Sequence, residues 1–299
     1  MIGADSTRIL SGPRDPWKKT LISVLQLGTL DYATALGLQQ KLVDLRKENR
    51  IGDVLLLLEH PPVITLGRNA QRKNILASPD LLAERGVEVY ECDRGGDVTF
   101  HGPGQLVGYP IFDLRGLASS EAKRKSLGAI EYVRRLEEVL IRTCAGFGIP
   151  AGRVPGLTGV WTRPMPAEQG AAPTGAGAHR RASTDGLEAK IAAIGVHISR
   201  GVTSHGFALN GNTDLDYFNL IIPCGIAARP VTSMAKELGE ALRLQEVAHA
   251  VSRNFGTVFA SPIFWLDGLD SLLANPTGVP VKLPAELRKL HQEEETFLA

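Results

Sequence analysis

The sequence predicts a mixed α/β fold, in which strands and helices alternate along one main globular domain. Apolar runs suited to buried strands, such as VLLLL at 54–58, alternate with stretches whose apolar residues recur at helical spacing, such as 30–49. A chain of 299 residues with 43% hydrophobic content can bury one substantial core but hardly two full domains.

The first half of the chain supplies most of the predicted strands. We expect order to begin near residue 20, at LISVLQLG, after a loose polar leader at 1–19. Ser78 and Pro79 are expected to start a short helix, with the serine as cap and the proline in the first turn. Strands are predicted at 54–60, 63–67, 87–93, 97–101 and 105–114, and helices over 30–49 and 121–146.

The second half continues the pattern around one irregular segment. Residues 163–187 are rich in Ala, Gly, Pro and Ser without periodicity, which predicts a disordered surface insertion. The main domain is expected to span 20–260, followed by a C-terminal extension at 261–299. Further strands are predicted at 157–162, 189–199 and 202–210, and a final helix over 243–259.

Charge and composition exclude several classes of partner. The formal net charge is only +1, which gives no electrostatic reason to bind a polyanion, so nucleic acid is not expected as a partner. No apolar run is long enough to span a bilayer, and the first residues lack the apolar core of a signal peptide. Three widely spaced cysteines fit a reducing compartment better than a disulfide framework. We therefore expect a cytoplasmic protein.

One cysteine has the setting of a reactive thiol. Cys92 falls in an alternating strand and Cys144 on the apolar stripe of a helix, so both are interpreted as small core residues. Cys224 instead follows an apolar run and stands between Pro223 and Gly225, on a sharp turn where a thiol can project into a cleft. A buried loop cysteine is the alternative interpretation.

A nucleophilic thiol needs a neighbouring base or cation, because a free thiol with a pKa of about 8.5 is mostly protonated at neutral pH. The candidates are His101, His197, His205 and Lys190. Lys190 opens the strand KIAAIGV, whose small and apolar residues would desolvate the ammonium and favour its neutral form. A lysine at an exposed strand end, reaching into water, is the simpler interpretation from the strand alone.

The segment RGGDVTFHGPGQ at 94–105 combines glycines and prolines with Arg94, His101 and Gln105. Its glycines let main-chain groups approach a substrate without side-chain obstruction, although a purely structural hairpin would have a similar composition. The segment contains neither a P-loop nor GxGxxG before a helix, so no nucleotide cofactor is predicted.

These motifs resemble those of the lipoyl(octanoyl) transferases, the octanoyl-carrier-protein to protein N-octanoyltransferases of lipoate biosynthesis. The resemblance covers about residues 20–260 and rests on several motifs in one order. They are EHPPVITLGR at 59–68, RGGDVTFHGPGQLVGYPIFDL at 94–114, TGVW at 158–161, KIAAIGVHISRGVTSHGFALN at 190–210 and NTDLDYFNLIIPCGI at 212–226.

The resemblance implies a fold like the catalytic domain of biotin and lipoate protein ligases. It implies that Cys224 takes the octanoyl group as a thioester and that Lys190 is its partner. Substrate contacts in the family map onto three segments, which contain Arg94, Gly95, Gly96, Asp97, Val98, Thr99, Phe100 and His101, then Ala193, Ile194 and Gly195, then Gly206, Phe207 and Ala208.

The implied donor is octanoylated acyl carrier protein, and the implied acceptors are lipoyl domains of 2-oxoacid dehydrogenase E2 subunits and the glycine cleavage H protein. No cofactor or metal is implied. The sequence departs from the family pattern at Phe100, where tyrosine is common, and in the insertion at 163–187. A carrier-docking face on or near the long helix is a further hypothesis, with a solvated helix surface as its alternative. Its basic residues are Lys123, Arg124, Lys125, Arg134 and Arg135.

Two other functions stay open from the sequence. An ATP-dependent lipoate or biotin ligase of similar fold would need no cysteine nucleophile. A metal or carrier-protein binder would use His101, His197, His205 and Cys224, but their spacing matches no standard zinc pattern.

Overall fold

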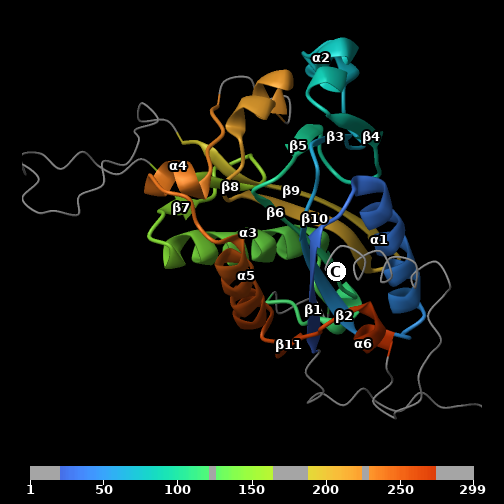
Figure 1. Cartoon of the computed structure of the whole chain (residues 1–299). Coiled ribbons are helices and arrows are strands. Elements are labelled where there is room, and N and C mark those ends of the chain that lie inside the picture. The colour runs from blue at the N-terminus through green and yellow to red at the C-terminus, as the bar shows by residue number, and fades with distance from the viewer. Residues whose placement is uncertain (1–20, 121–125, 164–187, 224–228, 274–299) are drawn as a thin grey trace, which may run out of the picture.

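The structure, a computed structural model, describes residues 21–120, 126–163, 188–223 and 229–273. Its strands form an eight-stranded mixed sheet in the order β11-β1-β2-β6-β10-β9-β8-β7 and a separate three-stranded sheet in the order β4-β3-β5. The small sheet stands at one end of the large one, with the short helix α2 above it (Figure 1). The predicted mixed α/β fold is confirmed.

The large sheet is buried on both faces at its centre because its middle strands are apolar on both sides. β2 (Asp53–Glu59) is buried at every residue except the last, as the run VLLLL predicts. The other strands are β1 (Ile22–Thr29), β6 (Gln105–Ile111), β7 (Ala151–Gly152), β8 (Val160–Thr162), β9 (Lys190–Ser199), β10 (Val202–Asn210) and β11 (Ile263–Trp265).

Helices cover the two faces of this sheet. α1 (Tyr32–Lys47) packs on one face, and α3 (Ala129–Gly146) and α5 (Leu244–Phe259) pack on the other (Figure 1). α1 begins where the Asp31 carboxylate accepts a hydrogen bond from the Thr34 N–H at 2.8 Å. It joins the parallel strands β1 and β2, so the three elements form a βαβ unit.

The small sheet consists of β3 (Val63–Leu66), β4 (Glu88–Glu91) and β5 (Val98–His101). α2 (Pro79–Glu84) begins as the sequence predicts, with the Ser78 hydroxyl accepting from the Leu81 N–H at 3.2 Å and Pro79 in the first turn. A separate apolar cluster, which includes Phe100 of β5 and Leu82 of α2, packs against one face of this sheet.

Several predicted boundaries shift, and some short elements escaped prediction. The strand predicted at 105–114 ends at Ile111, and the helix predicted from 121 begins at Ala129, with 121–125 outside the described residues. The two-residue strand β7 and the edge strand β11 were missed, as were α4 (Met234–Leu238), α6 (Leu269–Leu273) and the 3₁₀ turns. Elements this short carry no periodicity to detect.

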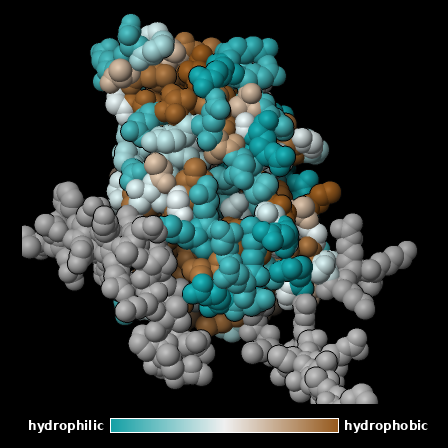
Figure 2. Space-filling view, turned by 90° about the vertical axis from the view of Figure 1, so that its right-hand side faces the viewer, coloured by the Kyte–Doolittle hydropathy of each residue, from teal (hydrophilic) through white to brown (hydrophobic). Residues whose placement is uncertain are grey.

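β11 pairs in parallel with β1, so the residues just after 260 extend the edge of the large sheet. This pairing does not test the predicted domain boundary at residue 260, which stays a prediction. The predicted leader and most of the predicted insertion also stay predictions, because they lie outside the described residues. Along the described part of the chain, no helix combines the length and apolar character that crossing a bilayer would require. The face carrying α1 is largely hydrophilic, with hydrophobic patches near the small sheet (Figure 2).

Candidate active site

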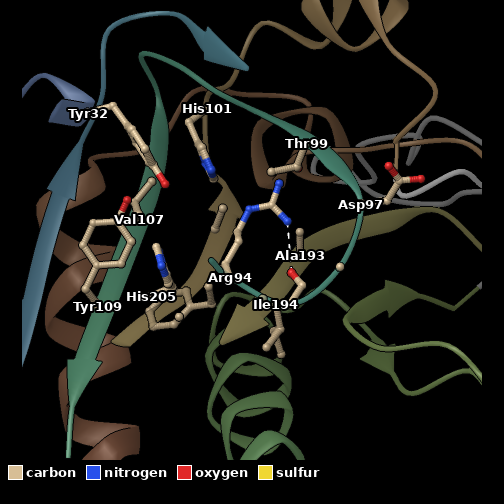
Figure 3. Close-up of a pocket in the computed structure, with 16 residues that line it drawn as sticks. Tyr32, Arg94, Asp97, Thr99, His101, Val107, Tyr109, Ala193, Ile194 and His205 are labelled. Atoms are coloured by element: carbon tan, nitrogen blue, oxygen red, sulfur yellow. Dashed lines mark hydrogen bonds between the residues drawn. The ribbon is translucent and has the colours of Figure 1, made fainter. Parts of the chain in front are cut away.

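A largely apolar pocket lies between the large sheet, the small sheet and the start of α1, and we call it the acyl pocket. Figure 3 shows its side chains converging from these elements. It is lined by Tyr32, Arg94, Gly95, Gly96, Asp97, Thr99, His101, Val107, Tyr109, Ala193, Ile194, Gly195, His205, Gly206, Phe207 and Ala208. The three segments that the resemblance implied as substrate contacts therefore meet at one cavity.

Strand alternation divides the residues of β5 between two environments. Thr99 and His101 line the acyl pocket, whereas Val98 and Phe100 belong to the apolar cluster of the small sheet. The Phe100 ring stacks on Tyr217 with centroids 4.7 Å apart. The side chain of Phe100 thus packs in an apolar core. A phenylalanine suits this place, because it lacks the hydroxyl of the tyrosine that is common in the family.

Arg94 holds the Gly-rich loop against β3. Its Nε donates to Thr65 Oγ1 at 3.0 Å, and its Nη2 donates to the Thr65 carbonyl at 2.6 Å. The residue is only 7% exposed, and no carboxylate pairs with it among the ion pairs of the described residues. A buried guanidinium held by neutral oxygens retains its positive field within the pocket.

Asp97 points away from the pocket centre (Figure 3). Its Oδ1 accepts from the Gln71 and Val98 N–H groups at 3.1 and 2.8 Å, and its Oδ2 accepts from Asn74 Nδ2 at 2.5 Å. The Asp97 carboxylate therefore holds the segment 71–74 against the start of β5. Asp97 contributes to the pocket mainly through its backbone.

Two glycines permit the backbones around the pocket to approach closely. A Cβ at Gly195 would lie 2.7 Å from the Gly95 carbonyl, and one at Gly206 would lie 2.1 Å from the Gly108 carbonyl. The Gly95 N–H also donates to the Val196 carbonyl at 3.0 Å. The Gly-rich loop thereby lies directly on β9, as only glycine would allow.

A hydrogen-bond chain sets the tautomer of His101. Asn210 Nδ2 donates to the Thr232 carbonyl at 2.9 Å, and Gln105 Nε2 donates to Asn210 Oδ1 at 2.9 Å. Gln105 Oε1 must then accept from His101 Nδ1 at 2.8 Å, which leaves Nε2 with its lone pair. Burial, followed by the charges of His60 and Arg94, lowers the pKa of His101 to about 3, so the imidazole is neutral at pH 7.

Lys190 is buried, which overturns the simpler interpretation of an exposed lysine at a strand end. It is 8% exposed, and its Nζ lies 4.9 Å from the centroid of the Trp161 ring. Its backbone accepts from the Thr232 N–H and donates to the Pro230 carbonyl at 3.0 and 2.8 Å. The side chain lines a small second cavity, the lysine pocket, which shares Thr99, Ala193 and Ala208 with the acyl pocket.

Cys224 lies outside the described residues, as do Lys123, Arg124 and Lys125. Its chain neighbour Pro223 lines the lysine pocket together with Lys190. On the other side of 224–228, Val231 lines the same cavity and forms a parallel bridge with Lys190. The described residues on either side of 224–228 are thus held beside the lysine.

The other two cysteines have different surroundings. Cys144 is fully buried in the core, where burial raises the pKa of its thiol to about 12, so it is an inert core residue as predicted. Cys92 is half-buried, and its Sγ donates to the Leu66 carbonyl at 3.5 Å.

The remaining candidate histidines sit around one carboxylate. His205 Nε2 lies 2.6 Å from Asp93 Oδ1, and His197 Nε2 lies 3.5 Å from Asp93 Oδ2. His205 lines the acyl pocket and His197 does not. Within the described ranges, no group of three or more His, Cys, Asp or Glu side chains is arranged to hold a metal ion.

Sequence reasoning did not single out Tyr32, Tyr109 or Trp161 as site residues. His60 Nε2 is 2.7 Å from the Tyr109 hydroxyl, and its Nδ1 is 2.6 Å from the Leu30 carbonyl, so these groups support one wall of the acyl pocket. The only sequence signal for Trp161 is its place in the TGVW motif. Tyr32 gave no signal, because it is the first residue of an otherwise ordinary helix.

The fold and the cavity define an α/β enzyme domain with a buried lysine beside an apolar pocket, and sequence comparison identifies its class. The profile of the lipoyl protein ligase A/B catalytic domain matches residues 31–256. The chain belongs to this family.

Individual relatives narrow the identification. An octanoyltransferase from Koribacter versatilis is 58% identical over 274 residues, which cover 92% of this chain and 98% of the relative. An octanoyltransferase from Acidobacterium capsulatum is 54% identical over 255 residues, which cover 85% of this chain and 96% of the relative. The resemblance to octanoyltransferases is confirmed, and the chain is an acyltransferase.

Solved structures confirm the fold. The bipartite lipoate protein ligase from Thermoplasma acidophilum, at 16% identity, superposes with a TM-score of 0.58 and covers 91% of each chain. Lipoate-protein ligase A bound with ATP, at 15% identity, gives a TM-score of 0.56 and covers 91% of this chain and 94% of its own.

Proposed function

We propose that the chain transfers an octanoyl group from acyl carrier protein to the lysine amine of lipoyl domains, through a thioester on Cys224. The acceptors are the lipoyl domains of 2-oxoacid dehydrogenase E2 subunits and the glycine cleavage H protein. The observation that carries the proposal is the lysine pocket, where buried Lys190 and Pro223 line one cavity that adjoins the apolar acyl pocket.

The first half of the reaction forms the thioester. The ammonium of Lys190 stabilises the Cys224 thiolate, which attacks the carbonyl carbon of the octanoyl donor. A new carbon–sulfur bond forms as the carrier thiolate leaves. Since one thioester replaces another, this exchange is nearly thermoneutral. The alkyl chain enters the acyl pocket, whose apolar walls bury it from water.

The second half transfers the group to an amine. Acylation removes the negative charge of the thiolate, so Lys190 loses the partner that favours its protonated form. It then accepts a proton from the incoming lysine amine, which attacks the thioester carbonyl and expels the Cys224 thiolate. The amide product is more stable than the thioester, so this half drives the reaction forward.

The proposed substrate contacts are those of the acyl pocket, in the segments 94–101, 193–195 and 206–208. Val98 and Phe100 would support this site from the apolar cluster behind β5. The proposal places the reaction in a reducing compartment such as the cytoplasm, because the thiol must stay reduced, and Cys92 and Cys144 are free thiols.

The decisive experiment looks for the thioester directly. The protein is incubated with octanoylated carrier protein, and an octanoyl adduct that hydroxylamine removes is sought by intact mass. We expect the adduct in the wild-type protein and in the control Cys92→Ser, but not in Cys224→Ala. An adduct that maps to another residue, or full turnover in Cys224→Ala, would refute the proposal. Turnover of free octanoate with ATP in that variant would instead indicate a ligase.

A further inference from the structure

We propose that His205 limits the length of the acyl chain that the enzyme accepts, by closing the far end of the acyl pocket. The inference rests on the proposed function, since it assumes that an acyl chain occupies this pocket. Its basis is the place of His205 in the fold, where this one residue lines two cavities.

The backbone of His205 departs from regular strand geometry. Its φ is +53°, a left-handed conformation that is uncommon for residues other than glycine. Thr203, two residues earlier, contacts Tyr132 of α3, so regular alternation would turn His205 toward the α3 face. Ser204 and His205 instead line the same groove on the α1 face, because the left-handed residue breaks the alternation.

Two contacts hold this unusual conformation. The His205 N–H donates to Gln39 Oε1 of α1 at 2.8 Å, and the ring Nε2 lies 2.6 Å from Asp93 Oδ1. The side chain is 3% exposed, so the imidazole is a fixed part of the wall. Figure 3 shows it on the wall of the acyl pocket near Tyr109.

His205 lies between the acyl pocket and a polar groove of about 270 Å³, which is bounded by α1 and the strands β9 and β10. Among the residues that line the two cavities, His205 alone is common to both. Gln39, Asp93 and His197 line the groove only. Removing the imidazole would therefore open the far end of the acyl pocket into the groove.

The spacing along β10 suits a medium acyl chain. Ala208 is shared with the lysine pocket, and His205 lies three residues along the same strand, a backbone distance of at most about 10 Å, since a regular strand rises roughly 3.3 Å per residue. An extended octanoyl chain that starts beside Lys190 would end near the imidazole. Longer chains would meet the wall.

The test compares acyl chains of different length on carrier protein. We expect His205→Gly, which suits a positive φ, to raise the ratio of kcat/KM for dodecanoyl over octanoyl donor by at least roughly tenfold, since a closed pocket rejects each extra methylene by about that factor. His205→Asn, with a shorter side chain that also tolerates the left-handed region, should give a smaller increase in the same direction. Thermal melting of each variant checks that it is folded.

His197→Ala is the matched control, because it also removes an imidazole beside Asp93 but lines only the groove. It should keep the wild-type ratio. An unchanged ratio in folded His205→Gly and His205→Asn would overturn the inference, as would an equal increase in His197→Ala. Octanoyl transfer by the wild-type protein is measured in the same series. Its absence would refute the proposed function, whereas its presence with unchanged ratios would refute only the role of His205.

Discussion

Trp161 offers a sharp test of how the buried lysine is positioned. The residue is 2% exposed, and two cations lie over its ring, with Lys190 Nζ at 4.9 Å and Arg229 Cζ at 5.4 Å from the ring centroid. A cation over an indole at a desolvated site gains about 2 kcal/mol. We expect the ring to hold the Lys190 ammonium at the lysine pocket, where the proposed thioester chemistry takes place.

The perturbation is Trp161→Leu, with Trp161→Phe as its partner variant. Both remove the indole N–H, which finds no hydrogen-bond partner among the described residues, and both reduce side-chain volume. Only phenylalanine keeps an aromatic face. Loss of about 2 kcal/mol corresponds to a factor of roughly 30 in rate. We therefore expect the leucine variant to form the octanoyl adduct about 30-fold more slowly than wild type and clearly more slowly than the phenylalanine variant.

The assay is single-turnover acylation followed by intact mass across a range of pH, with thermal melting as a measure of folding. A change in how the ammonium is held should shift the pH profile of acylation, which a simple loss of packing would not do. Arg229→Gln serves as a control, because it removes the second cation from the same ring. Equal rates in the folded leucine and phenylalanine variants would refute the reasoning, and so would a full reproduction of the leucine effect by Arg229→Gln.

Two further predictions concern stability. Gly159→Ala should lower the free energy of unfolding by about 3 kcal/mol, because Gly159 has a φ of +118° and a Cβ there would lie 2.7 Å from the Ala192 carbonyl. Chemical denaturation measures the loss, and Gly146→Ala, at an unobstructed helical position, should show none. Acidification should also destabilise the protein, because burial lowers the pKa of His60 from 6.5 to about 4, so the unfolded chain takes up the proton first. The free energy of unfolding should fall as pH drops from 6.5 toward 4, by about 2 kcal/mol at pH 5 from this residue. If His60→Gln lost as much free energy of unfolding between pH 7 and pH 5 as the wild-type protein, the assignment of this pH dependence to His60 would be contradicted.

The sequence determined the elements whose signals are local. The run VLLLL predicted the doubly buried strand β2, Ser78 with Pro79 predicted the start of α2, and the four-residue spacing from Leu140 predicted the burial of Cys144. Each depends on short-range periodicity or on a cap within a few residues. The motifs along the chain also determined its family, since their residues and order are read directly from the sequence.

The tertiary structure decided which residues share an environment. Lys190 could be interpreted as an exposed lysine from its strand, and only the contacts with Trp161 and the segment at 230–232 show it buried. Strand alternation separates Val98 and Phe100 from Thr99 and His101, but only the packing of the distant Leu220 and Ile221 decides which pair faces a core. The N–H of His205, which is in the left-handed conformation, donates to Gln39, 166 residues distant in sequence. Such contacts join segments far apart in the chain, so no local pattern of residues encodes them.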